Sequence, residues 1–140
     1  MAAGACRTTG PRLRNEGTEQ ETTNRVKWIE HKDKRILFEN MSGLRDSTDI
    51  CDVSDNSTAL ICKQPESSVL LITDVTNAYY NPYAVNRLKE NTKVTTPHMK
   101  AHVVVGITGL MRVVLHSVVI FTGQDIKMCD TVEEAKEWLA

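Results

Sequence analysis

Catalytic sequence motifs are missing from this chain. Its 140 residues contain no GxxxxGKS/T phosphate loop, no GxSxG nucleophile turn and no HExxH zinc motif, each of which indicates a known chemistry. The segment GITG at 106–109 is too short to indicate a nucleotide site. Cys129 has no sequence neighbour that would activate it as a nucleophile. We therefore expect a protein that is not an enzyme, and we expect no cofactor.

An excess of charge of one sign is missing as well. The 17 lysines and arginines nearly balance the 18 aspartates and glutamates, so the net charge is -1. Such a chain has no broad electrostatic attraction to nucleic acid. We therefore expect no nucleic-acid partner.

Cysteine pairs and long apolar runs are also lacking. The four cysteines include no CxxC pair, and the N-terminus lacks the apolar core of a signal peptide. Both features favour a cytoplasmic location. The most apolar stretch, 109–122, has 14 residues, whereas a membrane-spanning helix needs roughly 20. We expect no integral membrane segment.

The histidines do not form a metal-binding pattern. His98 and His102 are four residues apart, a spacing that binds metal only on a helix. Pro97 precedes this pair and an apolar strand follows it, so the two histidines fall on a loop and a strand start. We expect no metal site.

The remaining composition is that of one globular domain. A chain of 140 residues with 41% hydrophobic residues can bury one core. Residues 1–24 are rich in Gly, Thr, Glu and Arg and have few large aliphatic side chains. Such a stretch buries too little surface to offset its ordering entropy. We expect a flexible N-terminal leader at 1–24 and a domain at 25–140.

Hydrophobic periodicity and cap residues predict an α/β domain. The expected helix-terminal residues are Asp46 or Ser47, Asn81, Thr131 and, at a C-terminus, Gly123. Strand patterns occur at 25–31, 35–41, 68–73, 101–107 and 126–129, and helix patterns at 46–63, 110–121 and 131–140. A further helix should begin at Pro82 and carry Val85 and Leu88 inward. The first two strands should form an antiparallel hairpin. Ile50, Val53, Leu60 and Ile61 should form a narrow buried stripe on the first helix. The buried face of the last helix should comprise Val132, Ala135, Trp138 and Leu139. The predicted order is ββαβαβαβα, with a mixed sheet of about five strands and about four helices.

Two polar turns are predicted to lie side by side. Strands that alternate with helices are usually parallel, so the turns at 74–77 and 108–109 should meet at one edge of the sheet. Both precede helices, whose free amides can hold an anion. Such an edge is the usual place for a site in an open α/β sheet. The predicted partner or ligand edge comprises Asp74, Thr76, Asn77, Tyr79, Tyr80, Thr108, Gly109 and Arg112.

Simpler interpretations remain open for the same residues. Asp74 and Thr76 could merely bond backbone amides in a turn, while Tyr79 and Tyr80 partly cover the edge of the core. The apolar helix at 109–122 could fill the core or form a homodimer seam. Alternatively, it could wall a pocket for a lipid or another apolar molecule.

Four segments carry a resemblance to a known family. They are VKWIEHKDKRILFENMSGL, VLLITDVTNA, KAHVVVGITGLMRVVLHSV and MCDTVEEAKEWLA. Together they resemble the SpoIIAA-like group of STAS-domain proteins, often described as STAS/SEC14-like, over about residues 25–140. The resemblance implies a single STAS-like domain, an α/β sandwich with a mixed sheet, and a role in signalling or binding rather than catalysis.

The resemblance also suggests a phosphorylation switch. In anti-sigma-factor antagonists of the STAS class, a serine at the start of the helix after the central strand is phosphorylated. Thr76 is the matching position, although this chain has Asp74-Val75-Thr76-Asn77 where the usual pattern is Asp-Ser-Ser-Gly. Thr76 is therefore the candidate phosphoacceptor.

Together these features predict a non-enzymatic, STAS-like regulatory module. We expect it to bind an unidentified protein partner through the edge formed by 74–80 and 108–112. The alternative is a carrier or sensor of a small apolar, lipid-like or anionic ligand at the same edge.

Overall fold

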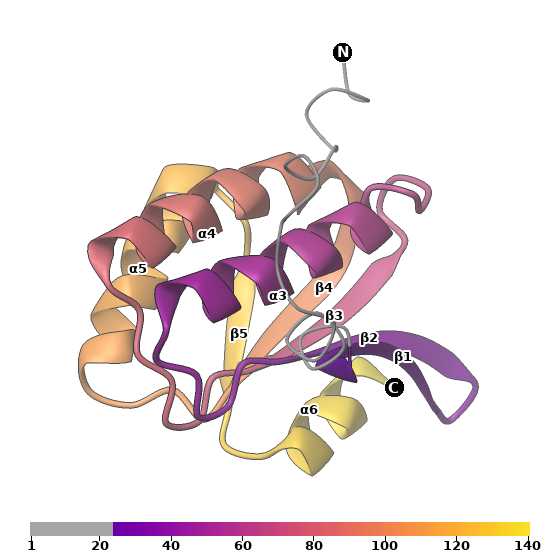
Figure 1. The fold of residues 1–140 in the computed structure, drawn as a ribbon. Helices are drawn as coiled ribbons and strands as arrows, with labels where there is room; N and C mark the ends of the chain where they lie inside the picture. Colours follow the sequence, from indigo (N-terminus) through magenta and orange to yellow (C-terminus); the bar gives the residue numbers. More distant parts are fainter. Residues whose placement is uncertain (1–23) are drawn as a thin grey trace.

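One mixed sheet forms the centre of the molecule, and its strands lie in the order in which they occur in the sequence (Figure 1). The computed structural model describes residues 24–140. All of the predicted leader except Asn24 lies outside these residues, so the leader stays a prediction. β1 (Val26–His31) pairs antiparallel with β2 (Lys34–Asn40); β3 (Val69–Asp74), β4 (Met99–Val105) and β5 (Ile126–Cys129) follow in parallel.

The helices divide unequally between the two faces of the sheet. α3 (Ser47–Ile61), α4 (Pro82–Thr95) and α5 (Leu110–Thr122) cover one face, and α6 (Val132–Leu139) lies on the other (Figure 1). A 3-10 turn, Thr96–His98, links α4 to β4. Each crossover adds its strand to the same side of the sheet, so right-handed crossovers place three helices on one face. The predicted fold class and the order ββαβαβαβα are confirmed.

Local sequence signals account for where the helices begin and end. Asp46 accepts hydrogen bonds from the amides that open α3, and Asn81 does the same for α4, with Pro82 in the first turn. Thr131 caps α6 through the amide of Glu134, at 3.1 Å. Gly123 ends α5 with φ +74°, a conformation that glycine adopts readily. These predicted caps are confirmed.

Helix α3 is buried more widely than its apolar stripe predicted. Ser54 and Asp55 are buried against α4, where the Asn91 amide donates to both, at 2.8 and 2.9 Å. The Arg87 guanidinium also donates to Asp55. The narrow-stripe prediction was therefore incomplete, because α3 packs polar side chains against α4 in addition to its apolar contact with the sheet.

Helix α5 does not simply fill the core. Leu115 and Val118 are buried, but Leu110, Val113, Ile120 and Phe121 are exposed. α5 is the last helix in its row and has a helical neighbour, α4, along one side (Figure 1). Part of its apolar surface therefore remains open, so the core alone does not account for this helix.

Helix α6 covers the second face with a narrow contact. Ala135 and Leu139 are buried as predicted, whereas Trp138 is 51% exposed and was wrongly assigned to the buried face. Lys127 places its ammonium 5.4 Å from the centre of the indole ring. The carboxylate of Glu137 accepts a hydrogen bond from Lys32 at 2.7 Å, which ties α6 to the tip of the β1–β2 hairpin.

Candidate functional site

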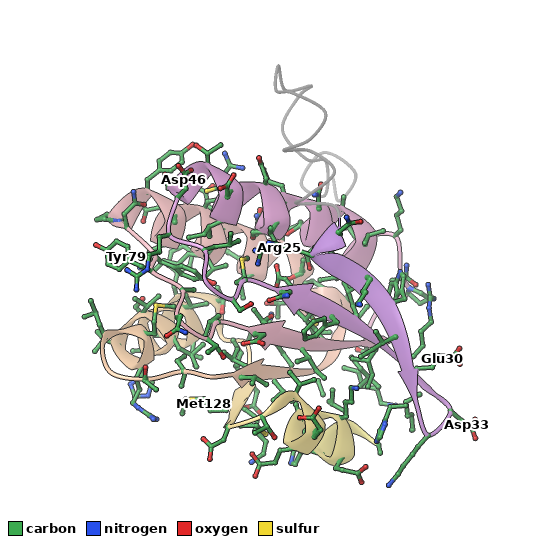
Figure 2. The ribbon with its side chains drawn as sticks, turned by 60° about the horizontal axis from the view of Figure 1, so that its bottom comes forward. Arg25, Glu30, Asp33, Asp46, Tyr79 and Met128 are labelled. Atoms are coloured by element: carbon green, nitrogen blue, oxygen red, sulfur yellow. The ribbon has the colours of Figure 1, made fainter. Side chains whose placement is uncertain are left out.

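The loops at the carboxyl ends of the parallel strands form one connected surface. The Gly43 amide donates to the Thr76 carbonyl at 2.8 Å, and the Tyr79 amide donates to the Leu44 carbonyl at 3.0 Å. Tyr79 lies at this end of the molecule, opposite the hairpin tip at Asp33 (Figure 2). The loop after β2 and the loop after β3 are therefore joined by backbone hydrogen bonds.

A groove of about 210 Å³ opens at this edge, and we call it the edge groove. Its lining includes Arg45, Asn77, Tyr79, Thr108, Leu110 and Met111. The strand order never reverses, so the groove is not the crevice that accompanies a reversal in doubly wound sheets. It lies instead between the loop after β3 and the start of α5.

The residues predicted for the edge are only partly gathered in this groove. Asn77, Tyr79, Tyr80 and Thr108 line it, while Asp74, Thr76, Gly109 and Arg112 do not. Gly109 is the N-cap of α5. The Arg112 guanidinium lies 3.5 Å from the sulfur of Met128, on β5. The functional role of these residues stays a prediction.

Thr76 occupies a tight turn rather than a helix start. Its amide and its hydroxyl both donate to Oδ1 of Asp74, at 3.0 and 2.7 Å. The following helix begins only at Pro82. Thr76 also packs against Gly106, where a Cβ atom would lie 2.0 Å from its hydroxyl oxygen. Residues 77–81 therefore separate this turn from the helix that follows it.

A chain of buried polar side chains crosses the sheet beneath α3, α4 and α5. The Thr73 hydroxyl lies 2.8 Å from Oε1 of Glu39, to which it donates when the acid is ionised, and 2.9 Å from Nε2 of His102. Nδ1 of His102 lies 2.6 Å from the side-chain carbonyl of Gln124. The Gln124 amide donates to the Thr96 hydroxyl at 3.0 Å. We call Glu39, Thr73, His102 and Gln124 the buried polar chain.

The single proton of the Thr73 hydroxyl decides how this chain can be satisfied. If Glu39 is protonated, it can donate to Thr73, Thr73 can donate to Nε2 of His102, and Nδ1–H can donate to Gln124. If Glu39 is ionised, Thr73 donates to Glu39, and a neutral His102 cannot then donate from both nitrogens. The uncharged arrangement therefore satisfies every member without burying a charge.

Burial acts in the same direction on both titratable members. Desolvation raises the pKa of Glu39 from 4.5 to about 7, although the hydroxyls of Thr73 and Ser57 lower it. Desolvation also lowers the pKa of His102 from 6.5 to about 4, against the effect of Gln124. Near neutral pH, His102 is therefore uncharged and Glu39 is close to its midpoint.

The buried polar chain borders an internal cavity of about 60 Å³ between the sheet and the three helices. Most of its wall is apolar and includes Leu71, Leu115 and Val118. Tyr80 also lines the cavity and is only 6% exposed, so it is not an exposed edge residue as its neighbour Tyr79 is. Within 24–140, the Tyr80 hydroxyl has no hydrogen-bond partner.

The cavity and the edge groove share part of their walls. Val75, Tyr80, Met111 and Val114 line both. The edge groove is therefore separated from the interior by side chains alone, and not by a complete strand or helix.

Sequence reasoning missed the buried polar chain. A usable signal existed, because His102 is a lone polar residue in the apolar run 101–107 and Glu39 directly follows the apolar run 36–38. The register places Glu39 opposite Thr73, and pairs His102 with Leu71, two residues before Thr73. Residues two apart in a strand point to the same face, so the three polar side chains meet on one face. This meeting depends on strand pairing, which the local pattern does not reveal.

Comparisons with known proteins bear on the fold. No protein-family model and no curated protein matches the sequence. Among solved structures, an uncharacterized protein of the DUF3478 family with a SpoIIAA-like fold, from Shewanella loihica PV-4, superposes with a TM-score of 0.59. The chain has a SpoIIAA-like fold. The alignment covers 82% of this chain and 92% of that chain at 18% identity, so the likeness extends to the fold alone.

Two classes of feature are absent from the SpoIIAA-like domain as the structure describes it. Residues 24–140 contain no group of three or more His, Cys, Asp or Glu side chains arranged to hold a metal ion. No helix in the same range combines the length and the apolarity needed to cross a membrane.

The contact between Gly106 and Thr76 should be sensitive to a single methyl group. We expect Gly106→Ala to lower the free energy of unfolding by about 3 kcal/mol, because φ is +80° and the new Cβ meets Thr76. Gly123→Ala is the control, since its φ is +74° and nothing lies within 4 Å of a Cβ there; its cost should be about 1 kcal/mol. Urea unfolding of both variants measures the difference, and equal losses would contradict the contact.

The raised pKa of Glu39 should appear in the pH dependence of stability. Between pH 4.5 and about 7 the folded chain holds a proton that the unfolded chain has lost, so the wild type loses stability as pH rises. Glu39→Gln retains a donor toward Thr73 without titrating. The stability of this variant relative to the wild type should therefore rise by about 3 kcal/mol across this range, at about 1.4 kcal/mol per pH unit.

The titration of His102 provides the internal control for that experiment. Its lowered pKa means that the unfolded chain binds a proton between pH 6.5 and about 4 while the folded chain does not. Stability of Glu39→Gln should therefore fall as pH drops through this window. Denaturant unfolding at a series of pH values measures both effects, and parallel profiles for the variant and the wild type would count against a buried, protonated Glu39.

Proposed function

We propose that the protein is a non-enzymatic interaction module that binds a segment of a partner protein in the edge groove. The observation that supports this most directly is the exposure of large apolar side chains from the loop after β3 and from the first turn of α5. Tyr79 is 43% exposed and Leu110 is 68% exposed, and both line the groove. Exposed apolar side chains gathered at a concave site are typical of protein-binding surfaces.

The charge at the groove indicates the chemistry of the partner segment. Arg45 is exposed and lines the groove, and no ion pair within the described part of the chain engages it. An apolar side chain inserted between Tyr79 and Leu110, with an acidic residue facing Arg45, would complement this surface. The resemblance of the sequence to SpoIIAA-like proteins also supports a binding role.

The groove can be tested by placing a photo-reactive amino acid at position 110 and expressing the protein in its own cells. We expect one specific crosslinked partner, and Arg45→Glu should reduce its yield at least about tenfold, because the acidic contact is reversed. The matched control carries the same amino acid at Ile120, which lies on the same helix and is 84% exposed. Equal crosslinking from both positions, or a yield independent of Arg45, would argue against the groove.

The candidate phosphoacceptor provides a second test of the same site. A phosphate on Thr76 would add nearly two negative charges next to the Asp74 carboxylate that its hydroxyl now contacts at 2.7 Å. We expect Thr76→Glu to weaken partner binding. Thr76→Ala should preserve binding, because the Thr76 amide still bonds Asp74. The crosslinking yield from position 110 measures both, and equal yields would remove the support for a phosphorylation switch.

A further inference from the structure

The buried polar chain ends against α4 on a backbone carbonyl, which can only accept hydrogen bonds. The Thr96 hydroxyl donates to the Thr92 carbonyl at 2.7 Å. The Gln124 amide donates to Thr96 at 3.0 Å, which places its side-chain carbonyl 2.6 Å from Nδ1 of His102. Because an amide carbonyl cannot donate, Nδ1 must carry the proton of the neutral imidazole.

The same reasoning then determines the protonation of Glu39. With the proton on Nδ1, His102 presents Nε2 as an acceptor, and Thr73 donates its one hydroxyl proton there at 2.9 Å. The Thr73 oxygen can then only accept from Glu39, 2.8 Å away. A carboxyl group donates only when it is protonated. The carbonyl on α4 therefore requires a protonated acid on β2.

Two buried hydroxyls favour the ionised acid instead. Ser57 is 2% exposed and Tyr80 is 6% exposed, and both line the cavity with Glu39. Neither hydroxyl makes a hydrogen bond within residues 24–140, and Ser57 is close enough to lower the pKa of Glu39. A carboxylate accepts hydrogen bonds more strongly than a carboxylic acid does. These two donors therefore stabilise the ionised form more than the protonated form.

Ionisation of Glu39 requires the hydrogen bonds of the chain to run in the opposite direction. Thr73 then donates to Glu39 and accepts from Nε2–H of His102, so Nδ1 becomes an acceptor. The present arrangement places the carbonyl of Gln124 at Nδ1, and two acceptors cannot bond each other. The Gln124 amide must therefore turn over, so that its NH₂ group faces His102.

The α4 end of the chain can accommodate this reversal. Once the Gln124 amide has turned over, its carbonyl faces Thr96, whose hydroxyl can donate to it. That hydroxyl must then leave the Thr92 carbonyl. The Thr92 carbonyl still accepts from the Thr95 hydroxyl at 3.1 Å and from the backbone amide of Thr96. Both directions of the chain therefore satisfy its members.

Few groups compete with Glu39 for a proton near neutral pH. Burial, and then the charge of Glu39, raise the pKa of Tyr80, and burial lowers the pKa of His102 to about 4. β1 places Val26 opposite Glu39, and the cavity-lining residues of α5 and β5 are apolar. The buried ionisable groups of α3 are Cys51, Asp52 and Asp55, the last of which accepts a hydrogen bond from Arg87 of α4.

We propose that the buried polar chain is a reversible relay that transmits the loss of a proton at Glu39 to the C-terminus of α4. The proton of Glu39 passes to a base in the solvent. The imidazole of His102 stays neutral and keeps one proton, which moves from Nδ1 to Nε2, and the Gln124 amide turns over. At α4 the hydrogen bond from the Thr96 hydroxyl to Thr92 is given up.

The test is ¹⁵N NMR of the His102 imidazole from about pH 5 to about pH 9. The shift of each ring nitrogen shows whether it carries a proton, so the tautomer is observed directly. We expect Nδ1–H at low pH and Nε2–H at high pH, with a midpoint near pH 7, and a shift of the Thr96 amide with the same midpoint. One tautomer over the whole range, or an imidazolium in the folded protein above about pH 5, would overturn the proposal.

Two variants separate a relay from a local titration. Glu39→Gln cannot lose a proton and keeps a donor toward Thr73, so His102 should remain in the Nδ1–H form at every pH. Gln124→Met removes the connection to Thr96, so the pH-dependent shift of the Thr96 amide should be lost.

Either variant can contradict the relay. A tautomer change that persists in Glu39→Gln would exclude Glu39 as its source, and a Thr96 shift that persists in Gln124→Met would exclude Gln124 as the connection. If Gln124→Met does not fold, the comparison of Glu39→Gln with the wild type still decides. These measurements need no partner protein, so their outcome is independent of the edge groove.

Discussion

The direction in which strands are added constrains every other feature of this SpoIIAA-like fold. Each crossover after β2 moves one strand further along the sheet, so α3, α4 and α5 cover the same face. The sheet therefore has one thick side with a cavity and one thin side covered by α6. The same progression makes α5 the last helix in its row and leaves part of its apolar surface exposed. It also brings the loops after β2, β3 and β4 to one edge, where the edge groove forms.

On the sheet face covered by α3, α4 and α5, burial of the polar chain costs free energy of folding. Glu39, Thr73 and His102 occupy positions where apolar side chains would pack without any hydrogen-bonding requirement. Their cost is offset only because each lies within hydrogen-bonding distance of the next. The buried polar chain thus gives one part of an otherwise apolar cavity wall a set of hydrogen-bonding groups.

Local signals in the sequence were sufficient for the elements but not for the site. Asn81 before Pro82 and Gly123 after α5 act on their immediate neighbours, so these boundaries could be predicted. Tyr79 and Tyr80 show the limit, since adjacent tyrosines face solvent and interior respectively. Glu39 and His102 meet through β3, and that meeting depends on the register of three strands. Register follows from global packing, which short-range patterns do not encode.

The wall shared by the edge groove and the cavity has a thermodynamic consequence. Tyr80 and Met111 contact both spaces, so an occupant of one that shifts these side chains changes the free energy of binding in the other. By linkage the effect is reciprocal: an occupant of the cavity that alters partner affinity by some factor has its own affinity altered by the same factor. Such coupling needs no domain movement and no second subunit. The edge groove and the cavity are thus coupled within one domain through the side chains they share.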